Sequence, residues 1–481
     1  MRTRSIMGPA ERTRTARLPG PASRAAIVAC GRPSRVRLAA AACVPLALAA
    51  FSPALAQPCT PQWVGDIGTP GSNGYVGAFA THNFGQGKRV FAGGAFTRMA
   101  NISAAKGVAQ YNPATNTWSA MGGGVFTTNT NYFVAALTTY NSPAGVRLLV
   151  GGWFATASNV PNTANLAAWD GTAWSSFTTP PDGAVWSFAT WNNDLYVGGG
   201  FTTIGGVAAT CIAKYNGTTF TPLNTGITGD FAPNVFAMTV YDDGNGPALY
   251  AAGRFNNVDG QNIQLLAKWN GSVWSKVGTG ITRNSSVADL SAITVFDDGN
   301  GPALYVGGYD FRPTGKPTTS VARWDGVAWT NVGANLGGRT TCFAVFNDGT
   351  GSTLYAGGTA QPGISYVYRL ENGQWATLGG GVSGVISSNF PSVFAMKADN
   401  DDLYVGGEFA AAGAVAAKGV VRWHACDCPA DFNYDGFVNG ADYDDFADLF
   451  DGADPGADLN GDGFVNGNDY DLFADHFDQG C

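Results

Sequence analysis

The chain has 481 residues, of which 45% are apolar and 13% charged, and this composition excludes a disordered chain and allows one large globular domain with a smaller one. The formal net charge is −8, and fifteen acidic residues lie between positions 427 and 478 without any Lys or Arg. That balance argues against binding nucleic acid through its phosphates and favours a cation as a partner.

Residues 1–56 have the order of a secretory signal peptide. Nine Arg precede an apolar run over residues 38–50, and small residues at 54–56 precede Gln57. The apolar run is too short to span a membrane, so we expect a secreted, extracellular or cell-surface protein without a transmembrane segment. An Arg-rich organelle transit peptide is the alternative. Cleavage would leave 18 basic and 34 acidic residues, a net charge of −16.

A glycine doublet at the end of a short apolar strand recurs along residues 57–425. The copies begin at Gly93, Gly151, Gly198, Ala252 (in place of the first Gly), Gly307, Gly357 and Gly406. A period near 50 residues with this content is typical of a radial β-repeat. Turns such as Asn216-Gly217 and Asn270-Gly271 lie between β-rich runs, which is a strong hairpin signal. The seven copies therefore predict a mainly β fold, a seven-bladed β-propeller.

Two features of the repeat have expected packing roles. The glycines should let the backbones of neighbouring blades approach closely. Paired aromatics such as Trp269 with Trp274 and Trp324 with Trp329 should fill the wedge between adjacent sheets. Carbohydrate stacking by one of these aromatics is the alternative.

The repeats resemble two known families. Residues 112–118 (NPATNTW), which follow Gly93-Gly94 and Tyr111, resemble a kelch repeat. The wider pattern, Gly-Gly-x-Phe-Thr and then Ala-x-Trp-x-Gly-x-x-Trp, resembles the propeller repeats of Rax2-type surface proteins. Both resemblances imply a propeller, and neither specifies an activity.

The ends of the repeat region predict how the ring closes. The seventh copy stops after Trp423, and the segment 61–65 around Trp63 has the pattern of its missing outer strand. We expect this N-terminal strand to complete the last blade, which leaves no open edge. Cys59 and Cys426 would then lie at the ends of neighbouring strands, in reach of a disulfide. Cys211 and Cys342 fall in strands of different blades, so we expect buried free thiols there.

The propeller has two faces on which a site could lie. On one face, paired Asp in the turns 242–247 and 297–302 could bind calcium, although Asp and Gly are also ordinary turn residues. On the other face, the longer connections 226–234, 280–289 and 380–391 are the better candidates for ligand binding. The chain's three His are His82, His424 and His476, and they build no metal cluster in the propeller. We predict no catalytic residue, and a glycoside hydrolase or lyase with an Asp-based site on the long-loop face is the alternative.

The acidic tail contains two copies of a calcium-loop pattern, 27 residues apart. An EF-hand loop supplies oxygens from positions 1, 3, 5, 7, 9 and 12. The predicted ligands are Asp431, Asn433, Asp435, Phe437 (carbonyl), Asn439 and Asp442 in the first copy, and Asp458, Asn460, Asp462, Phe464 (carbonyl), Asn466 and Asp469 in the second. An apolar stripe follows each loop at helical spacing, through Tyr443, Phe446, Ala447 and Phe450 and through Tyr470, Phe473, Ala474 and Phe477. Two loop-helix units that bind two calcium ions and pack together are therefore predicted.

Two such loops with Asp at position 12 resemble a dockerin, and the terminal Gly480-Cys481 resembles the ending of a Gly-Cys-ended subgroup. The resemblance implies a small α-helical domain over 426–481, calcium-dependent folding, and docking to a cohesin. It also makes Cys428–Cys481 a candidate disulfide. The chain departs from the family at positions 10 and 11, where Gly440-Ala441 and Gly467-Asn468 replace the usual hydroxyl-bearing pair.

The sequence thus favours a secreted or cell-surface binding propeller, displayed or docked through a calcium-dependent module. The ligand of the propeller, a protein or a glycan, is not readable. A polysaccharide-active enzyme and a structural surface-layer component are the alternatives.

Overall fold

The computed structural model describes residues 61–65, 67, 70–126, 132–143, 145–349, 351–359, 367–387, 390–425, 430, 432, 438, 440–459 and 464–479. The chain divides into two compact units, Met1–Leu55 and Ala56–Cys481, and every described residue belongs to the second. The predicted signal peptide lies outside the described residues. In the part that is described, no helix is both long and apolar enough to cross a bilayer.

Antiparallel sheets follow one another along the chain. The first four consist of β2 (Val76–His82), β3 (Arg89–Gly94), β4 (Val108–Asn112) and β5 (Thr117–Ala120); β7 (Phe133–Ser142), β8 (Gly145–Trp153), β10 (Leu166–Trp169) and β11 (Trp174–Ser175); β12 (Val185–Trp191), β13 (Asp194–Gly199), β16 (Ile212–Tyr215) and β17 (Phe220–Pro222); and β19 (Asn234–Asp242), β20 (Pro247–Arg254), β22 (Leu266–Trp269) and β23 (Trp274–Ser275). A fifth contains β24 (Ile281–Arg283), β25 (Asp289–Asp297), β26 (Pro302–Pro313), β27 (Thr319–Trp324) and β28 (Trp329–Asn331).

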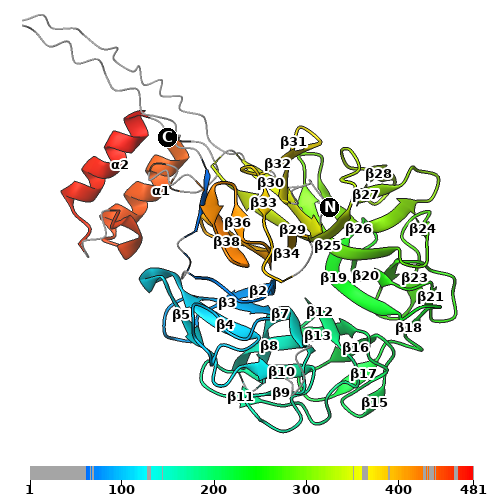
Figure 1. The fold of residues 1–481 in the computed structure, drawn as a ribbon. Helices are drawn as coiled ribbons and strands as arrows, with labels where there is room; N and C mark the ends of the chain where they lie inside the picture. Colours follow the sequence, from blue (N-terminus) through cyan, green and yellow to red (C-terminus); the bar gives the residue numbers. More distant parts are fainter. Residues whose placement is uncertain are drawn as a thin grey trace, which may run out of the picture. The chain divides into compact units, whose positions relative to one another are not determined.

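The largest sheet has eight strands. It joins β29 (Arg339–Asn347), β30 (Ser352–Thr359), β31 (Val367–Glu371) and β32 (Gln374–Thr377) to β34 (Ser392–Asp399), β35 (Asp402–Glu408), β38 (Val420–His424) and β1 (Gln62–Val64). The two groups meet at one bridge, between Thr359 and Ser392. Among the described residues, six sheets of four or more strands thus form a propeller-like arrangement, which Figure 1 shows.

Short ladders and 3-10 turns fill the connections. The ladders pair β6 (Val125–Phe126) with β9 (Thr156–Ala157), β14 (Thr203–Ile204) with β15 (Val207–Ala208), β18 (Ile227–Thr228) with β21 (Asn257–Val258), and β33 (Val382–Ser383) with β36 (Ala411–Ala412), which also pairs with β37 (Val415–Ala416). The 3-10 turns are η1 (Pro113–Thr115) and η2 (Pro455–Ala457). Three of the ladders, β6–β9, β18–β21 and β33–β36, pair the connection that follows one repeat with a loop of the next repeat. These ladders hold the loops between successive repeats in place.

The first strand of each repeat contacts the first strand of the next. These contacts run in the order β2, β7, β12, β19, β25, β29 and β34, and β34 contacts β2 again. Apolar clusters connect the same neighbours, and one cluster joins Val76 and Phe79 of the first repeat to Tyr404 and Val420 of the last. The order is therefore closed, as a propeller requires.

The predicted closure by the N-terminal strand is confirmed. β1 pairs antiparallel with β38, with Trp63 opposite Trp423. Their rings lie 5.0 Å apart, like the pairs Trp269–Trp274 at 5.2 Å and Trp324–Trp329 at 5.4 Å. The Trp63 indole donates a hydrogen bond of 2.9 Å to the Gly379 carbonyl of the preceding repeat. Equivalent indole bonds join the other repeats, from Trp118, Trp174, Trp274, Trp329 and Trp375. The paired aromatics are thus buried core, as the sequence predicts.

The two glycines of each doublet have different neighbours. A methyl group on the first glycine would collide with the next repeat: at Gly357 it would lie 2.6 Å from Val393 Cγ1, and at Gly406 2.7 Å from Phe79 Cε2. This confirms the predicted close approach of neighbouring blades. A methyl group on the second glycine would instead overlap a carbonyl oxygen of the first strand of its own repeat, as Gly253 would with Asn234. The second glycine is therefore required within the sheet.

Cys211 and Cys342 are both free thiols. Cys211 is buried, its thiol donates a 3.3 Å hydrogen bond to the Pro233 carbonyl, and burial raises its pKa to about 12. Cys342 is half-buried. The prediction that these cysteines do not form a bridge is confirmed.

The tail contains two helices, α1 (Gly440–Asp451) and α2 (Gly467–Gln479). Phe446 and Phe473, which occupy equivalent positions in the two copies, stack with their centroids 4.1 Å apart and an angle of 3°. The flanking contacts also come in equivalent pairs, such as Tyr443–Phe477 at 6.1 Å and Phe450–Tyr470 at 5.9 Å. The two units therefore pack on each other through the predicted stripes, in a nearly symmetric way.

Candidate functional site

The carboxylates at the hairpin ends are engaged by their own sheets. Asp243 accepts hydrogen bonds from Lys268 Nζ at 2.7 Å and from the Tyr250 hydroxyl at 2.9 Å. Lys268 and Tyr250 face each other on neighbouring strands. Burial by itself raises the pKa of Asp243, but the hydrogen bonds from Lys268, Tyr250 and Asn245 hold that pKa below its usual value.

This arrangement of Asp, Tyr and a cation recurs around the ring. It is formed by Asp298 with Tyr305 and Arg323, by Asp348 with Tyr355 and Arg369, and by Asp402 with Tyr404 and Arg422. The preceding residue in the turn, Asp242, caps the turn itself by accepting from the amides of Gly244 and Gly246, both at 2.9 Å. The hairpin carboxylates thus join strands and close turns, and these contacts favour the turn reading over a calcium site.

A cavity of about 350 Å³ lies at the hairpin ends where the first and last repeats meet. Its walls include His424, whose Nδ1 lies 2.8 Å from Asp402 Oδ1, and Lys88, whose Nζ lies 2.7 Å from Asp399. Within the described ranges, no three His, Cys, Asp or Glu side chains gather into a metal-binding group.

The other end of the first strands has a different character, because every first strand has a register shift there. The shifts fall between Val76 and Ala78, Val134 and Ala136, Val185 and Ser187, Val235 and Ala237, Leu290 and Ala292, Thr340 and Cys342, and Val393 and Ala395. Each is opposite a glycine doublet or Ala252-Gly253. A β-bulge re-aims the extra side chain and is common next to functional sites.

Aromatic side chains collect at these bulged ends. The Phe133 and Trp186 rings lie 4.9 Å apart at 30°, and Phe236 meets Trp186 edge-on at 5.5 Å. These three side chains are half-buried. Trp153, opposite Phe133 on the neighbouring strand, is 45% exposed. We call Phe133, Trp186 and Phe236 the aromatic row.

Charged side chains continue the row. The Arg254 guanidinium lies over the rings of Phe231 and Phe236, at 5.6 and 5.8 Å. Asp289 is fully buried and forms an ion pair of 2.9 Å with Arg339. Burial raises the pKa of the Asp289 carboxyl above its usual value, although Arg339 and the Ser291 hydroxyl act in the opposite direction. This end therefore carries aromatic surface beside two arginines and one buried acid.

The long connections are tied together at the same end. Asp230 binds Arg283 Nη2 at 2.5 Å and Asn256 Nδ2 at 2.6 Å, which joins connections 226–234 and 280–289. Glu408 is 2% exposed and accepts from the amides of Ile386, at 2.8 Å, and Ser387, which holds connection 380–391. The loops that the sequence predicts as a binding face are thus held by ion pairs and hydrogen bonds.

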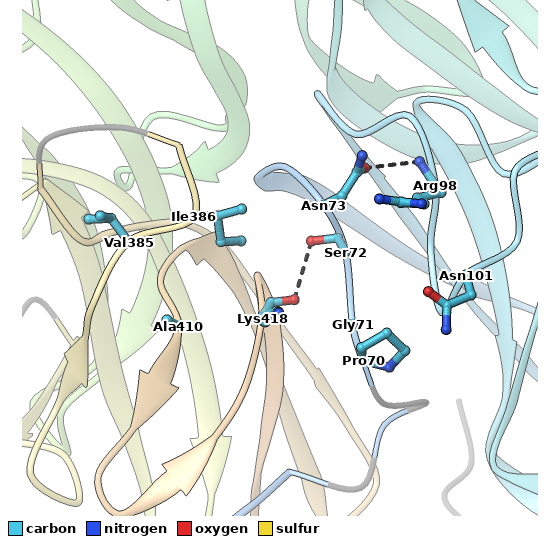
Figure 2. A pocket seen from close by; sticks show the side chains of 10 residues that line it. All are labelled: Pro70, Gly71, Ser72, Asn73, Arg98, Asn101, Val385, Ile386, Ala410 and Lys418. Carbon is cyan, nitrogen blue, oxygen red and sulfur yellow. Dashed lines mark hydrogen bonds between the residues drawn. The ribbon is translucent and has the colours of Figure 1, made fainter.

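A second cavity, of about 310 Å³, lies on this loop side where the first and last repeats meet (Figure 2). Its walls are fastened by backbone contacts: the Ser72 hydroxyl donates to the Lys418 carbonyl at 3.2 Å, and Asn73 Oδ1 accepts from the Arg98 amide at 3.0 Å. The wall also contains Ile386, from the connection that Glu408 holds. Arg98 and Lys418 are exposed, and no acid in the described ranges forms an ion pair with either. The cavity therefore offers two cations in an acidic chain.

The described part of the second predicted calcium loop forms a helix cap. The Asn466 side chain accepts from the Asn468 amide at 3.0 Å, and Asp469 accepts from the Asn466 amide at 2.9 Å. Asn466 is thus the helix N-cap, a role for which Asn is a preferred residue, and the Asp469 carboxylate satisfies the backbone amide of the cap residue. Asp442 and Asp469, at position 12 of each loop, are fully buried in the first turn of their helices.

Other predicted loop ligands are only partly visible. Asp458 follows η2 and is half-buried, and the Phe464 carbonyl accepts from Asn466 Nδ2 at 3.1 Å. The remaining predicted positions lie outside the described residues: Asp431, Asn433, Asp435, Phe437, Asn439, Asn460, Asp462, Cys59, Cys426, Cys428 and Cys481. The calcium sites and both candidate disulfides stay predictions.

No family model matches the chain, and no curated protein matches it in sequence. The kelch, Rax2-type and dockerin resemblances therefore remain those of the sequence motifs.

Solved structures resemble the fold at a distance. The extracellular domain of a protein described as a hybrid two component system from B. thetaiotaomicron has a TM-score of 0.48 at 12% identity, over 77% of this chain and 40% of that chain. A GH74 xyloglucanase from Xanthomonas campestris has a TM-score of 0.31 at 11% identity, over 73% and 66%. A GH74 enzyme from Niastella koreensis has a TM-score of 0.39 at 14% identity, over 74% and 61%. The chain spans two fifths of the length of the first neighbour, and likenesses this distant assign no activity.

Proposed function

We propose that the mature chain is a secreted or cell-surface recognition protein, whose propeller binds a ligand at the bulged strand ends and whose tail is a calcium-dependent docking module. One contrast between the two ends of the strands supports this proposal. At the hairpin ends, acids are paired with lysines, arginines and tyrosines of their own sheets. At the bulged ends, aromatic rings remain partly exposed beside arginines.

We also propose that the ring has seven blades. The eight-stranded sheet would then count as two blades, because each of its halves repeats the order of the other sheets, and the Thr359–Ser392 bridge is the one strand pairing between the halves among the described residues. Trp63 would serve as the outer-strand tryptophan of the last blade, with its indole bonded to Gly379 as its counterparts are bonded elsewhere.

For the tail, we propose two calcium ions and a cohesin-like partner protein. The symmetric helix pair and the two buried carboxylates at equivalent helix starts support two equivalent loops. Oxygen-rich loops at this spacing are what calcium prefers. The loop acids repel one another without a cation, so binding should be linked to folding.

Calcium titration of the mature chain, residues 57–481, tests the tail. We expect two sites by calorimetry and a gain of helical circular dichroism on binding. The double variant Asp435→Ala with Asp462→Ala should lose both sites. A matched control, Asp243→Ala at a hairpin turn, should leave the number of sites at two. Unchanged calcium binding in the double variant would refute the assignment.

A polysaccharide-active enzyme is the second candidate, because a fully buried acid with a raised pKa, Asp289, lies at the bulged ends. Such a carboxyl could act as a proton donor. Incubation of the mature chain with a polysaccharide panel separates the two functions. Recognition predicts capture of a ligand without new reducing ends or unsaturated products. Product release that Asp289→Asn abolishes would establish the enzyme instead.

A further inference from the structure

The bulged position differs between repeats while its neighbours hardly change. The residues inside the seven shifts are Gly77, Ala135, Trp186, Phe236, Ser291, Thr341 and Phe394. The flanking positions are nearly always Val or Leu on one side and Ala on the other. A position that accepts Gly, Ala, Ser and Trp in the same fold is not fixed by packing, so its large side chains need another explanation.

The aromatic row is placed to offer a ring face. Phe133 lies against Trp186 at 30°, and Phe236 meets the indole edge-on at 86°. The indole thus contacts one ring from each neighbouring repeat while its side chain stays partly exposed, which restricts its freedom before any ligand arrives. Partly exposed, preorganised aromatic rings are typical of binding surfaces, since they offer apolar area at a low entropy cost.

The charges beside the row favour an acidic ligand. Arg254 stacks on Phe231 and Phe236, and its Nε donates one long hydrogen bond of 3.4 Å to the Ala232 carbonyl. No acid within the described ranges forms an ion pair with Arg254. Asp289 forms an ion pair of 2.9 Å with Arg339 and also attracts Arg254 electrostatically, so one carboxylate faces two guanidinium groups. One guanidinium, with a planar fork suited to a carboxylate, therefore remains available in a chain with a large excess of acids.

We propose that the bulged ends of β7, β12 and β19 bind an acidic oligosaccharide, with the apolar face of a sugar ring on Trp186 and its carboxylate at Arg254. This inference rests on the proposed recognition function and names its ligand class. A sugar acid combines the two chemistries that the row presents, a C–H face for an aromatic ring and an anion for a guanidinium. A peptide ligand is the competing outcome.

The test uses the mature chain, residues 57–481, with calcium, and titration calorimetry with uronate hexasaccharides (oligogalacturonate, oligomannuronate and oligoguluronate). A neutral hexasaccharide, cellohexaose, is the comparison. At least one uronate should bind, and it should bind more tightly than the neutral sugar. Trp186→Ala should weaken that affinity about tenfold, the size expected for losing one ring contact. Arg254→Gln should weaken the uronate about tenfold and leave the affinity for the neutral sugar unchanged.

The controls separate a site from a folding defect. Ala occupies the bulge of the second repeat at Ala135, so Trp186→Ala should fold normally. Trp191→Ala removes a tryptophan from the hairpin end of the same strand, β12, and should leave uronate affinity unchanged. Equal losses in the Trp186 and Trp191 variants, or no uronate binding, would overturn the inference. Capture of a neutral glycan or a protein would then still support the proposed recognition function. Turnover of a polysaccharide would contradict both the recognition function and the acidic oligosaccharide as its ligand.

Discussion

The second glycine of the doublet provides the sharpest test of the fold. Ala252 and Gly253 are adjacent, but the first position of a doublet faces the next repeat, whereas Gly253 faces the backbone of its own first strand. A methyl group on Gly253 would overlap the Asn234 carbonyl oxygen and lie 3.0 Å from the carbonyl carbon and 3.1 Å from Val235 Cα. All three atoms are backbone, so no side chain can rotate away. The first strand would have to move at its bulge, next to the 2.9 Å hydrogen bond from the Gly253 amide to the Leu265 carbonyl.

The expected cost of Gly253→Ala follows from these contacts. Overpacking a closely packed site costs about 1–3 kcal/mol, and a weakened backbone hydrogen bond adds about 0.5–1.5 kcal/mol. The lower entropy of the unfolded alanine chain returns about 0.4–1 kcal/mol. We therefore expect a net loss of about 2–3 kcal/mol in the free energy of unfolding.

The matched variant is Ala252→Gly, which removes a fully buried methyl group. It should cost about 1.5 kcal/mol, from one lost apolar group and the greater backbone freedom of glycine. Urea unfolding of the mature chain, followed by tryptophan fluorescence and by circular dichroism, measures both. A loss in Gly253→Ala that is no larger than that in Ala252→Gly would show that the bulge does not require the glycine.

Two further predictions concern one ion pair and one disulfide. Arg339→Gln leaves the buried Asp289 carboxylate without its cation and should lower the free energy of unfolding by about 1–3 kcal/mol, a range reduced because Arg339 is partly exposed. The pKa of Asp289 is raised in the folded chain, so folding favours the protonated form of this carboxyl. The stability that the carboxyl contributes therefore declines as the pH rises from about 4, the pKa of an unfolded Asp, through the raised value. Asp289→Asn should remove this decline in pH-dependent urea unfolding, and an identical pH profile would contradict the argument. The Gln62–His424 pairing places Cys59 three residues before one strand partner and Cys426 two residues after the other, so we expect a Cys59–Cys426 disulfide in non-reducing peptide mapping. Recovery of either cysteine as a free thiol would refute the pairing.

The elements that the sequence predicts best are those that a fixed spacing encodes. The glycine doublets, the Asn-Gly hairpins and the tryptophan pairs recur about every 50 residues, so each copy supports the others. The role of Trp63 was predictable for the same reason, since the last copy lacks a hairpin that the N-terminal segment matches. The helical stripes of the tail repeat at 27 residues and were equally readable.

The bulges were not predictable, because one extra residue does not change the extended appearance of a strand. Val185, Trp186 and Ser187 read as a continuous β-rich segment, and only the pairing with Gly198 and Gly199 reveals the shift. The contacts of Asp243 were hidden for another reason. Its partners Tyr250 and Lys268 lie 7 and 25 residues away in sequence, and hydrogen bonding across strands brings them together.

The repeats also show how a site can be located by comparing the copies within one chain. Each repeat must satisfy the same packing demands, so positions that stay constant around the ring are explained by packing, as with the second glycine against its carbonyl. The bulged position is Gly77 in the first repeat and Trp186 in the third, so packing does not require one particular residue there. Ala135 is sufficient for folding at this position, and a partly exposed aromatic ring there is unfavourable in water. The aromatic residues in some repeats must therefore contribute something other than packing. The asymmetric placement of Trp186, Phe236 and Arg254 on neighbouring repeats therefore supports the proposed recognition of one ligand at one sector of the ring.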